Sequence, residues 1–203
     1  MSEESPTPPA NEESATNPDD AAQPVDGSVD ALVSLVERGA GIDLRDTTSP
    51  DDTPTPVDAE RATLLTRDAG DLVDGLARRL ATTNSLVAVL PHIDSTVIQT
   101  VQSDARSAVS SADVRIVFAG PARARVTKPR GTAIRAVLTA RSIDWYTSDE
   151  RAPVGLLLAD ENAVVGGFNQ GRLETALLST DDAIRTWVAE TCRRYLKSAD
   201  SRA

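Results

Sequence analysis

Basic residues are concentrated in one acid-free stretch of the sequence between residues 115 and 141. Its members are Arg115, Arg123, Arg125, Lys128, Arg130, Arg135 and Arg141. The planar guanidinium group of arginine forms paired hydrogen bonds with carboxylate and phosphate groups, so this stretch is suited to binding an anion. Three ligands fit that chemistry: an anionic metabolite, a nucleic-acid backbone, or an acidic protein surface such as the chain's own N-terminal part. A solvated basic face that balances nearby acids is the simpler alternative.

Nucleic acid is the least favoured of these ligands. Residues 119–141 contain no aromatic side chain that could stack on bases. An affinity that depends only on phosphate contacts also falls steeply with salt. We therefore do not expect direct DNA binding, and a nucleic-acid-associated accessory protein using residues 115–141 stays as the alternative function.

The candidate ligand site lies where two predicted strands end. His92 and Ser95 follow the first strand, and the basic loop predicted at residues 120–131 follows the second. Open α/β sheets bind ligands beyond the carboxyl ends of their strands. The predicted anion site consists of Arg123, Arg125, Lys128, Arg130, His92 and Ser95. A half-exposed loop position is the simpler interpretation of His92, and helix capping is the simpler one of Asp94 and Ser95.

Groups for covalent or metal chemistry are scarce. His92 is the only histidine and Cys192 the only cysteine, so no histidine-rich metal site, cysteine zinc cluster or intrachain disulfide is expected. No Ser-His or Cys-His spacing indicates a nucleophile with its base. We therefore predict no enzymatic activity, no metal and no cofactor.

The elements that must position the candidate site alternate in type along the body of the chain. The predicted helices cover residues 58–81, 94–110, 132–140 and 180–197, and the predicted strands cover 85–90, 114–119, 143–147, 154–159, 163–168 and 173–178. Short unbroken apolar runs such as residues 85–90 are typical of strands buried on both faces, and a strand, helix, strand unit is right-handed and parallel. The predicted fold is α/β, a mixed sheet with helices on both faces in the order α-β-α-β-α-β-β-β-β-α.

Finer expectations concern the C-terminal half. Residues 169–171 are predicted to form a three-residue hairpin loop with Gly171 in the left-handed conformation. The pair Gly166-Gly167 predicts a β-bulge. Neighbouring residues of a strand point to opposite faces, so one of Trp145 and Tyr146 should lie in the core. Trp187 and Tyr195 are predicted to be core residues of the last helix.

The N-terminal part of the chain differs sharply in charge from the rest. Residues 1–58 contain fourteen acidic residues and two basic ones, whereas the body is nearly balanced. Residues 1–57 are therefore predicted to be a disordered acidic tail, with one short helix near 29–38 capped by Ser28 and stopped at Gly39. That helix is expected either to pack against the body of the chain or to bind a partner protein. Residues 58–203 are predicted to form a single domain.

The C-terminal half resembles the effector domain of TrmB-type archaeal transcriptional regulators and their haloarchaeal relatives. The resemblance rests on a polar Trp-Tyr strand at 143–147, the segments Ala152–Asp160, Asn162–Arg172 and Leu177–Asp182, and the closing helix. It implies half of a phospholipase D-like fold that senses a small molecule or mediates dimer contacts. Phospholipase D chemistry needs a histidine followed two positions later by a lysine; here His92 is followed by Asp94, so this chemistry is not expected.

The regulators of this family carry a winged helix before the effector domain, and residues 1–57 offer only one short helix in its place. The resemblance therefore implies a stand-alone, non-catalytic sensor that binds an anionic small molecule and pairs with itself or with a full-length regulator. The nineteen arginines against two lysines are typical of haloarchaeal proteins. The sequence contains no apolar stretch of about 18 residues and no signal peptide, so we expect a cytoplasmic protein without membrane contact.

Overall fold

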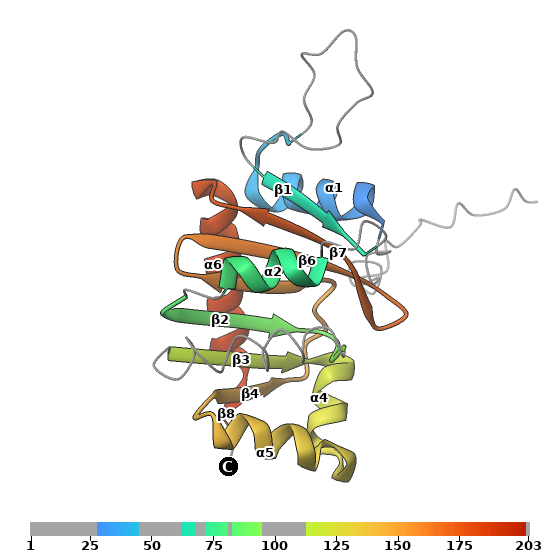
Figure 1. The fold of residues 1–203 in the computed structure, drawn as a ribbon, viewed down its shortest axis with the longest axis vertical. Coiled ribbons are helices and arrows are strands. Elements are labelled where there is room, and N and C mark those ends of the chain that lie inside the picture. The colour runs from blue at the N-terminus through green and yellow to red at the C-terminus, as the bar shows by residue number, and fades with distance from the viewer. Residues whose placement is uncertain (1–27, 45–61, 68–71, 81–82, 95–112, 202–203) are drawn as a thin grey trace, which may run out of the picture.

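Within the residues that the structure describes, the strands form one eight-stranded mixed sheet in the order β1-β7-β6-β5-β2-β3-β4-β8 (Figure 1). The structure is a computed structural model that describes residues 28–44, 62–67, 72–80, 83–94 and 113–201. The strands are β1 (Ala62–Thr66), β2 (Ser85–Leu90), β3 (Asp113–Ala119), β4 (Asp144–Ser148), β5 (Gly155–Ala159), β6 (Asn162–Asn169), β7 (Arg172–Ser179) and β8 (Asp200–Ser201). The helices are α1 (Val29–Ala40), α2 (Leu72–Leu80), α4 (Gly120–Thr127), the 3-10 helix η3 (Pro129–Gly131), α5 (Thr132–Ala140) and α6 (Asp182–Ser198).

The centre of the sheet agrees with the predicted strands. β2 pairs in parallel with β3 and antiparallel with β5, and β3 pairs in parallel with β4. The two apolar runs thus form adjacent parallel strands, as predicted. Because parallel strands run in the same direction, β2 and β3 end at the same edge of the sheet. The predicted helix at 94–110, which would connect them, lies outside the described residues apart from Asp94.

Helices cover both faces of the sheet, which confirms the predicted layer arrangement. Figure 1 shows α2 in front of the sheet and α6 behind it. Alternate strand residues enter the two cores: Val89 and Val117 lie in the core that includes residues of α1 and α6, whereas Ala88 and Ile116 lie in the core with residues of α4 and α5. On the latter face, Leu157 of β5 also packs against the core of α2, β6 and β7.

The N-terminal helix α1 docks on the body. Ser28 caps it as predicted, since its Oγ accepts a hydrogen bond from the Ala31 N–H (3.3 Å). The prediction that Gly39 stops the helix is wrong: the left-handed residue is Gly41, and Gly39 instead lies so close to Trp187 that a Cβ there would stand 2.3 Å from the indole ring. The residues buried beside α6 are Leu32, Val33, Val36 and Leu44. The core thus includes residues from both sides of the predicted boundary at 57/58; residues 1–27 and 45–57 of the predicted tail lie outside the described residues.

The predicted helix over residues 58–81 is wrong in its first half. Ala62–Thr66 form strand β1, which pairs antiparallel with β7, and among the described residues of this stretch the helix covers Leu72–Leu80. Leu64 and Leu65 are compatible with either periodicity, but as a strand they enter the cores on opposite faces of the sheet. Gly75 lets α2 approach β1, since a Cβ there would stand 2.6 Å from Leu65. The long-range pairing with β7 therefore overrides the local helical spacing.

The predicted loop over residues 120–131 is also wrong, because helix α4 and the 3-10 helix η3 occupy it. Pro121 stands in the first turn of α4, where its fixed φ favours a helix and its missing N–H costs no hydrogen bond. The guanidinium of Arg135 donates to the carbonyl oxygens of Val126 and Lys128 and so satisfies the C-terminal end of α4. Arg123 and Arg125 of the candidate site therefore belong to α4, Lys128 follows its last residue, and Arg130 belongs to η3.

The β6–β7 hairpin has a two-residue turn. Asn169 pairs with Arg172, and Gln170 (φ 50°) and Gly171 (φ 80°) both have the left-handed conformation. The predicted three-residue loop is wrong, although Gly171 has the predicted conformation; two left-handed residues are the signature of a type I′ turn. The register shifts between Gly167 and Phe168, which confirms the predicted bulge.

The remaining core predictions are mostly confirmed. Trp145 is buried, and Tyr146 points to the opposite face. Asp181 caps α6 by accepting hydrogen bonds from two backbone N–H groups, and Tyr195 is buried on that helix. Trp187 is only partly buried against the core. Strand β8, which pairs with β4, was not predicted.

Candidate functional site

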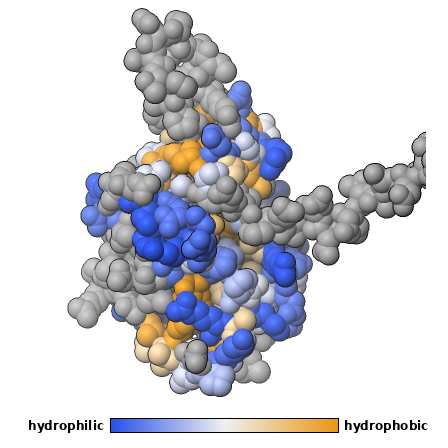
Figure 2. All heavy atoms as spheres, turned by 90° about the vertical axis from the view of Figure 1, so that its right-hand side faces the viewer, coloured by the Kyte–Doolittle hydropathy of each residue, from blue (hydrophilic) through white to orange (hydrophobic). Residues whose placement is uncertain are grey.

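The edge where β2 and β3 end brings part of the predicted anion site together. Residues 91–94 follow β2 directly, and α4 follows β3. The two segments are in contact, because the Ala122 N–H donates to the carbonyl oxygen of Pro91 (3.0 Å). Figure 2 looks onto this side of the molecule and shows hydrophilic residues over much of its middle, with hydrophobic surface above and below.

Arg125 is the predicted site residue that links the two segments. Its Nη1 donates to the carbonyl oxygen of Ile93 (2.8 Å), so a guanidinium from α4 is held at the segment that follows β2. The residue as a whole is exposed. Among the described residues this is the one hydrogen bond made by its side chain, so further N–H donors face solvent.

The other predicted basic residues are placed differently. Arg123 forms an ion pair with Asp149, which follows β4 (2.7 Å), and the Asp149 side chain is 78% exposed. Lys128 ends α4 and is exposed, with no side-chain partner among the described residues. Arg130 lies in η3, but its side chain is outside the description, and so is all of Ser95.

The basic run that lacks acids in sequence does not lack them in space. Arg115 forms an ion pair with Asp113 (2.6 Å), and the guanidinium of Arg135 is engaged with α4 and with Thr132 (3.1 Å). Of the seven basic residues, Arg125 and Lys128 are exposed and form no ion pair within the part of the chain that the structure describes. The described side chains that remain open to an anion are therefore fewer than the sequence predicted.

His92 contributes shape to this edge rather than charge. Its ring is half-buried and lies tilted against Phe168 of β6, with 5.4 Å between the ring centroids. A Cβ on Gly171 would stand 3.4 Å from Nδ1, so the hairpin turn passes close by. Burial lowers the pKa of His92 below its ordinary value of 6.5, so the ring is neutral at pH 7.

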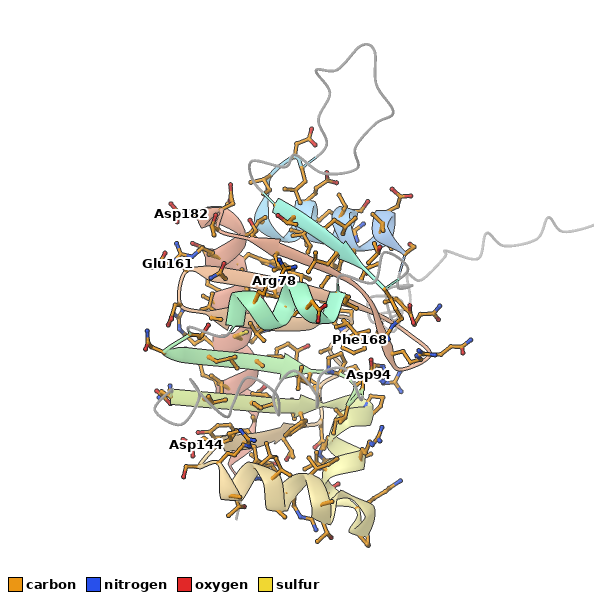
Figure 3. All side chains as sticks on the ribbon, viewed as in Figure 1. Arg78, Asp94, Asp144, Glu161, Phe168 and Asp182 are labelled. Carbon is orange, nitrogen blue, oxygen red and sulfur yellow. The ribbon has the colours of Figure 1, made fainter. Side chains whose placement is uncertain are left out.

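Asp94 has a role that the sequence did not reveal. Its carboxylate is 7% exposed, and Oδ2 accepts hydrogen bonds from Arg67 Nη2 (2.8 Å) and from the Leu173 N–H (3.1 Å). Figure 3 shows Asp94 and Phe168 at the same end of the sheet. Helix capping was the expected role, and the helix in question lies outside the described residues. Among the described residues, the carboxylate joins the end of β2 to β1 and β7.

Arg67, which follows β1, completes this arrangement. Besides Asp94, it donates from Nε to the carbonyl oxygen of Leu173 (2.8 Å) and lies 3.5 Å from the carboxylate of Glu174. We refer to Arg67, Asp94, Leu173 and Glu174 as the clasp. An acidic residue just after a buried strand was a usable signal for Asp94. No signal marked Arg67, because the predicted helix concealed the end of β1.

The chemistry available at this edge is charge pairing and hydrogen bonding. Cys192 is a buried residue of α6 that belongs to the core, and burial raises its pKa to about 12, so its thiol is a poor nucleophile. Among the described residues no three metal-ligating side chains come together. The same part of the chain contains no helix long and apolar enough to cross a membrane.

Comparison with known proteins identifies both a family and a fold. The family model for the middle domain of the methanogenesis regulatory protein FilR1 matches residues 46–198. The phospholipase D family member Nuc from Salmonella typhimurium has a TM-score of 0.54 at 12% identity, covering 70% of this chain and 97% of that one. NucT from Helicobacter pylori has a TM-score of 0.54 at 10% identity, covering 70% of this chain and 99% of that one.

A third solved structure is TrmBL2, described as an archaeal chromatin protein with a novel mode of DNA binding. Its TM-score is 0.48 at 14% identity over 70% of this chain, and the chain spans about half of its length (54%). No curated protein sequence matches.

The Nuc and NucT structures confirm the predicted phospholipase D-like fold, and the family match confirms the predicted likeness to the effector domain of a regulator.

Proposed function

Because this chain belongs to the family of the FilR1 middle domain, we propose that it serves transcriptional regulation by sensing an anionic small molecule where β2 and β3 end. The observation that carries the proposal is Arg125. Its exposed guanidinium is fixed to the carbonyl oxygen of Ile93 at the edge where open α/β sheets bind ligands. A guanidinium held in this way is already oriented for a carboxylate or phosphate group, which lowers the entropy lost on binding.

The neighbouring cations suggest a ligand with more than one negative charge. Arg123 is paired with the exposed carboxylate of Asp149, and exposed ion pairs contribute only about 0–1 kcal/mol. A phosphate dianion can therefore replace Asp149 at little cost. Lys128 extends the cationic surface from the end of α4. Phosphorylated sugars and three-carbon phospho-acids are the ligand class that we propose.

The domain is proposed to act without catalysis. The phospholipase D pattern needs a lysine two positions after its histidine, and the position after His92 and Ile93 is Asp94, a buried member of the clasp. The proposed partners are a second copy of the chain or a full-length regulator, in the cytoplasm. We do not favour the accessory nucleic-acid role, because Arg115 and Arg135 are occupied by contacts within the protein.

Isothermal titration of the full chain with glucose 6-phosphate, 3-phosphoglycerate and inorganic phosphate tests the proposal. We expect binding to at least one of them, with Arg125→Ala weakening it about tenfold, as the loss of one charged hydrogen bond predicts. Arg193→Ala, which removes an exposed arginine of α6, is the matched control and should leave binding unchanged. Asp149→Asn should strengthen binding a few fold, because it frees Arg123.

Two results would overturn the proposal: no binding of any of these anions, or the same affinity for the Arg125→Ala and Arg193→Ala proteins. A filter-binding assay with duplex DNA at low salt gives the comparison with the alternative function. Retention of DNA that declines steeply as salt rises would support the accessory role instead.

A further inference from the structure

Residues 91–94 are held from one side by α4. The carbonyl oxygen of Pro91 accepts from the Ala122 N–H (3.0 Å), and that of Ile93 accepts from Arg125 Nη1 (2.8 Å). The first of these bonds is made by the backbone of the helix. The second depends on one exposed side chain, and it is therefore the contact that a ligand of Arg125 can alter.

The same four residues are held from the other side by the clasp. Asp94 Oδ2 accepts from Arg67 Nη2 and from the Leu173 N–H. Arg67 in turn joins β1 to β7, because its backbone N–H and its Nε donate to the carbonyl oxygens of Glu174 (2.9 Å) and Leu173 (2.8 Å). The start of β7, next to the turn of the β6–β7 hairpin, is thus fixed by Asp94.

We infer that residues 91–94 couple the anion site on α4 to the tip of the β6–β7 hairpin, through the adjacent residues Ile93 and Asp94. An anion bound by the remaining N–H groups of Arg125 shares the guanidinium with the Ile93 carbonyl, so it shifts this hydrogen bond and with it the contacts of Asp94 with Arg67 and Leu173. This inference rests on the proposed function for the identity of the ligand, while the coupling itself rests on the contacts.

The coupling acts through two adjacent residues that have little freedom to move independently. Ile93 and Asp94 are both buried, at 6% and 7% exposure, and a planar peptide bond joins them, so a rotation at one residue moves the other. A buried carboxylate that loses a partner is costly, so a displaced Asp94 must carry Arg67 and Leu173 with it or lose its hydrogen bonds to them. Both outcomes change the start of β7.

His92 adds a second contact between the segment and the hairpin. Its ring lies against Phe168 of β6 and beside Gly171 of the turn. The bulge at Gly167/Phe168 breaks the regular ladder close to this point. Ladders are locally weaker at bulges, so the hairpin tip is the part of the sheet best able to respond to movement of residues 91–94.

Amide hydrogen exchange of the full chain tests the coupling. The reporters are the N–H of Leu173, which donates to Asp94, and the N–H of Arg67, which donates to Glu174. We expect Arg125→Ala to speed exchange at both about threefold to tenfold, the effect of losing one hydrogen bond. Arg123→Ala, which removes a guanidinium from the same helix but pairs with Asp149, is the control and should leave them unchanged. The amides of β2 and β3 report that each variant is folded.

Unchanged exchange at Leu173 and Arg67 in a folded Arg125→Ala protein would overturn the inference. Equal acceleration by Arg123→Ala would also overturn it, since α4 would then act as a whole. The two proposals fail separately: faster exchange in Arg125→Ala without any anion binding leaves the coupling and removes the ligand. Anion binding with unchanged exchange leaves the ligand and removes the coupling.

Discussion

The apolar face beneath α1 and α6 and the polar edge where β2 and β3 end are built on different physical principles. On the apolar face, Leu32, Val33 and Val36 of α1 are almost completely buried, and their contribution scales with the area removed from water. At the polar edge, stability and binding depend on individual charges, and burial decides what each charge does. Asp94 is 7% exposed and Asp149 is 78% exposed, although each pairs with one arginine.

This difference in burial decides which ion pair is structural and which one a ligand can replace. A buried carboxylate with several donors cannot leave without leaving a charge unpaired, so the Arg67–Asp94 pair is structural. An exposed carboxylate is replaced by water or by another anion at little cost, so the Arg123–Asp149 pair is exchangeable. The polar edge thus combines a fixed clasp with a replaceable pair, one on each side of residues 91–94.

The largest expected effect comes from removing α1 and so opening the apolar face. Deleting residues 1–57 should unfold the domain at room temperature, since it removes four buried side chains, those of Leu32, Val33, Val36 and Leu44. Burying each of them stabilises the fold by roughly 1.5–3 kcal/mol. That sum is comparable with the total stability of a typical domain, about 5–15 kcal/mol. Circular dichroism during thermal melting measures the loss.

Deleting residues 1–27 is the matched control, because it keeps Ser28 and α1. Its melting temperature should be close to that of the full chain, and equal melting of the two deletions would show that α1 contributes nothing to the core.

The shorter deletion also tests whether the acidic N-terminal residues mask Arg125 and Lys128. If they do, anion affinity should rise when the seven acidic residues of this segment are removed.

A smaller effect should distinguish the two ion pairs. Asp94→Asn should lower the free energy of unfolding by about 2–3 kcal/mol, since it removes the buried negative charge to which Arg67 Nη2 and the Leu173 N–H donate. Asp149→Asn should change it by less than about 1 kcal/mol. Urea denaturation of both variants measures the difference, and equal losses would remove the distinction between the fixed and the replaceable pair.

The smallest effect is a pH dependence at His92. Burial lowers the pKa of His92, so below about its ordinary value of 6.5 the unfolded chain binds a proton that the folded chain does not yet accept. The stability contributed by neutral His92 is therefore present above pH 6.5 and is lost as the pH falls. His92→Gln should show a shallower decline in stability between about pH 7 and 5 than the unmodified protein. Parallel declines in the two proteins would exclude His92 as the cause.

Several parts of the fold were predictable because their signals are local. The apolar runs at β2 and β3 predict buried parallel strands, the cap at Asp181 predicts the start of α6, and Gly166-Gly167 predicts the bulge. The possible catalytic chemistry could also be narrowed from the sequence, since one histidine and one cysteine leave few catalytic arrangements. These conclusions need only residue types and spacing, which tertiary contacts do not change.

The clasp and the replaceable pair were decided by tertiary structure alone. Arg67 contacts Leu173 across 106 residues of sequence, and β1 is a strand only because β7 lies beside it. Local spacing in residues 62–66 suits a helix as well as a strand, so the choice falls to the pairing energy of distant segments. The acid-free run likewise seemed unpaired until the fold brought Asp149 to Arg123. The sequence by itself determined which charges this protein has, and only the folded chain decided which of them remain available to a ligand, because burial and pairing are properties of the packed structure.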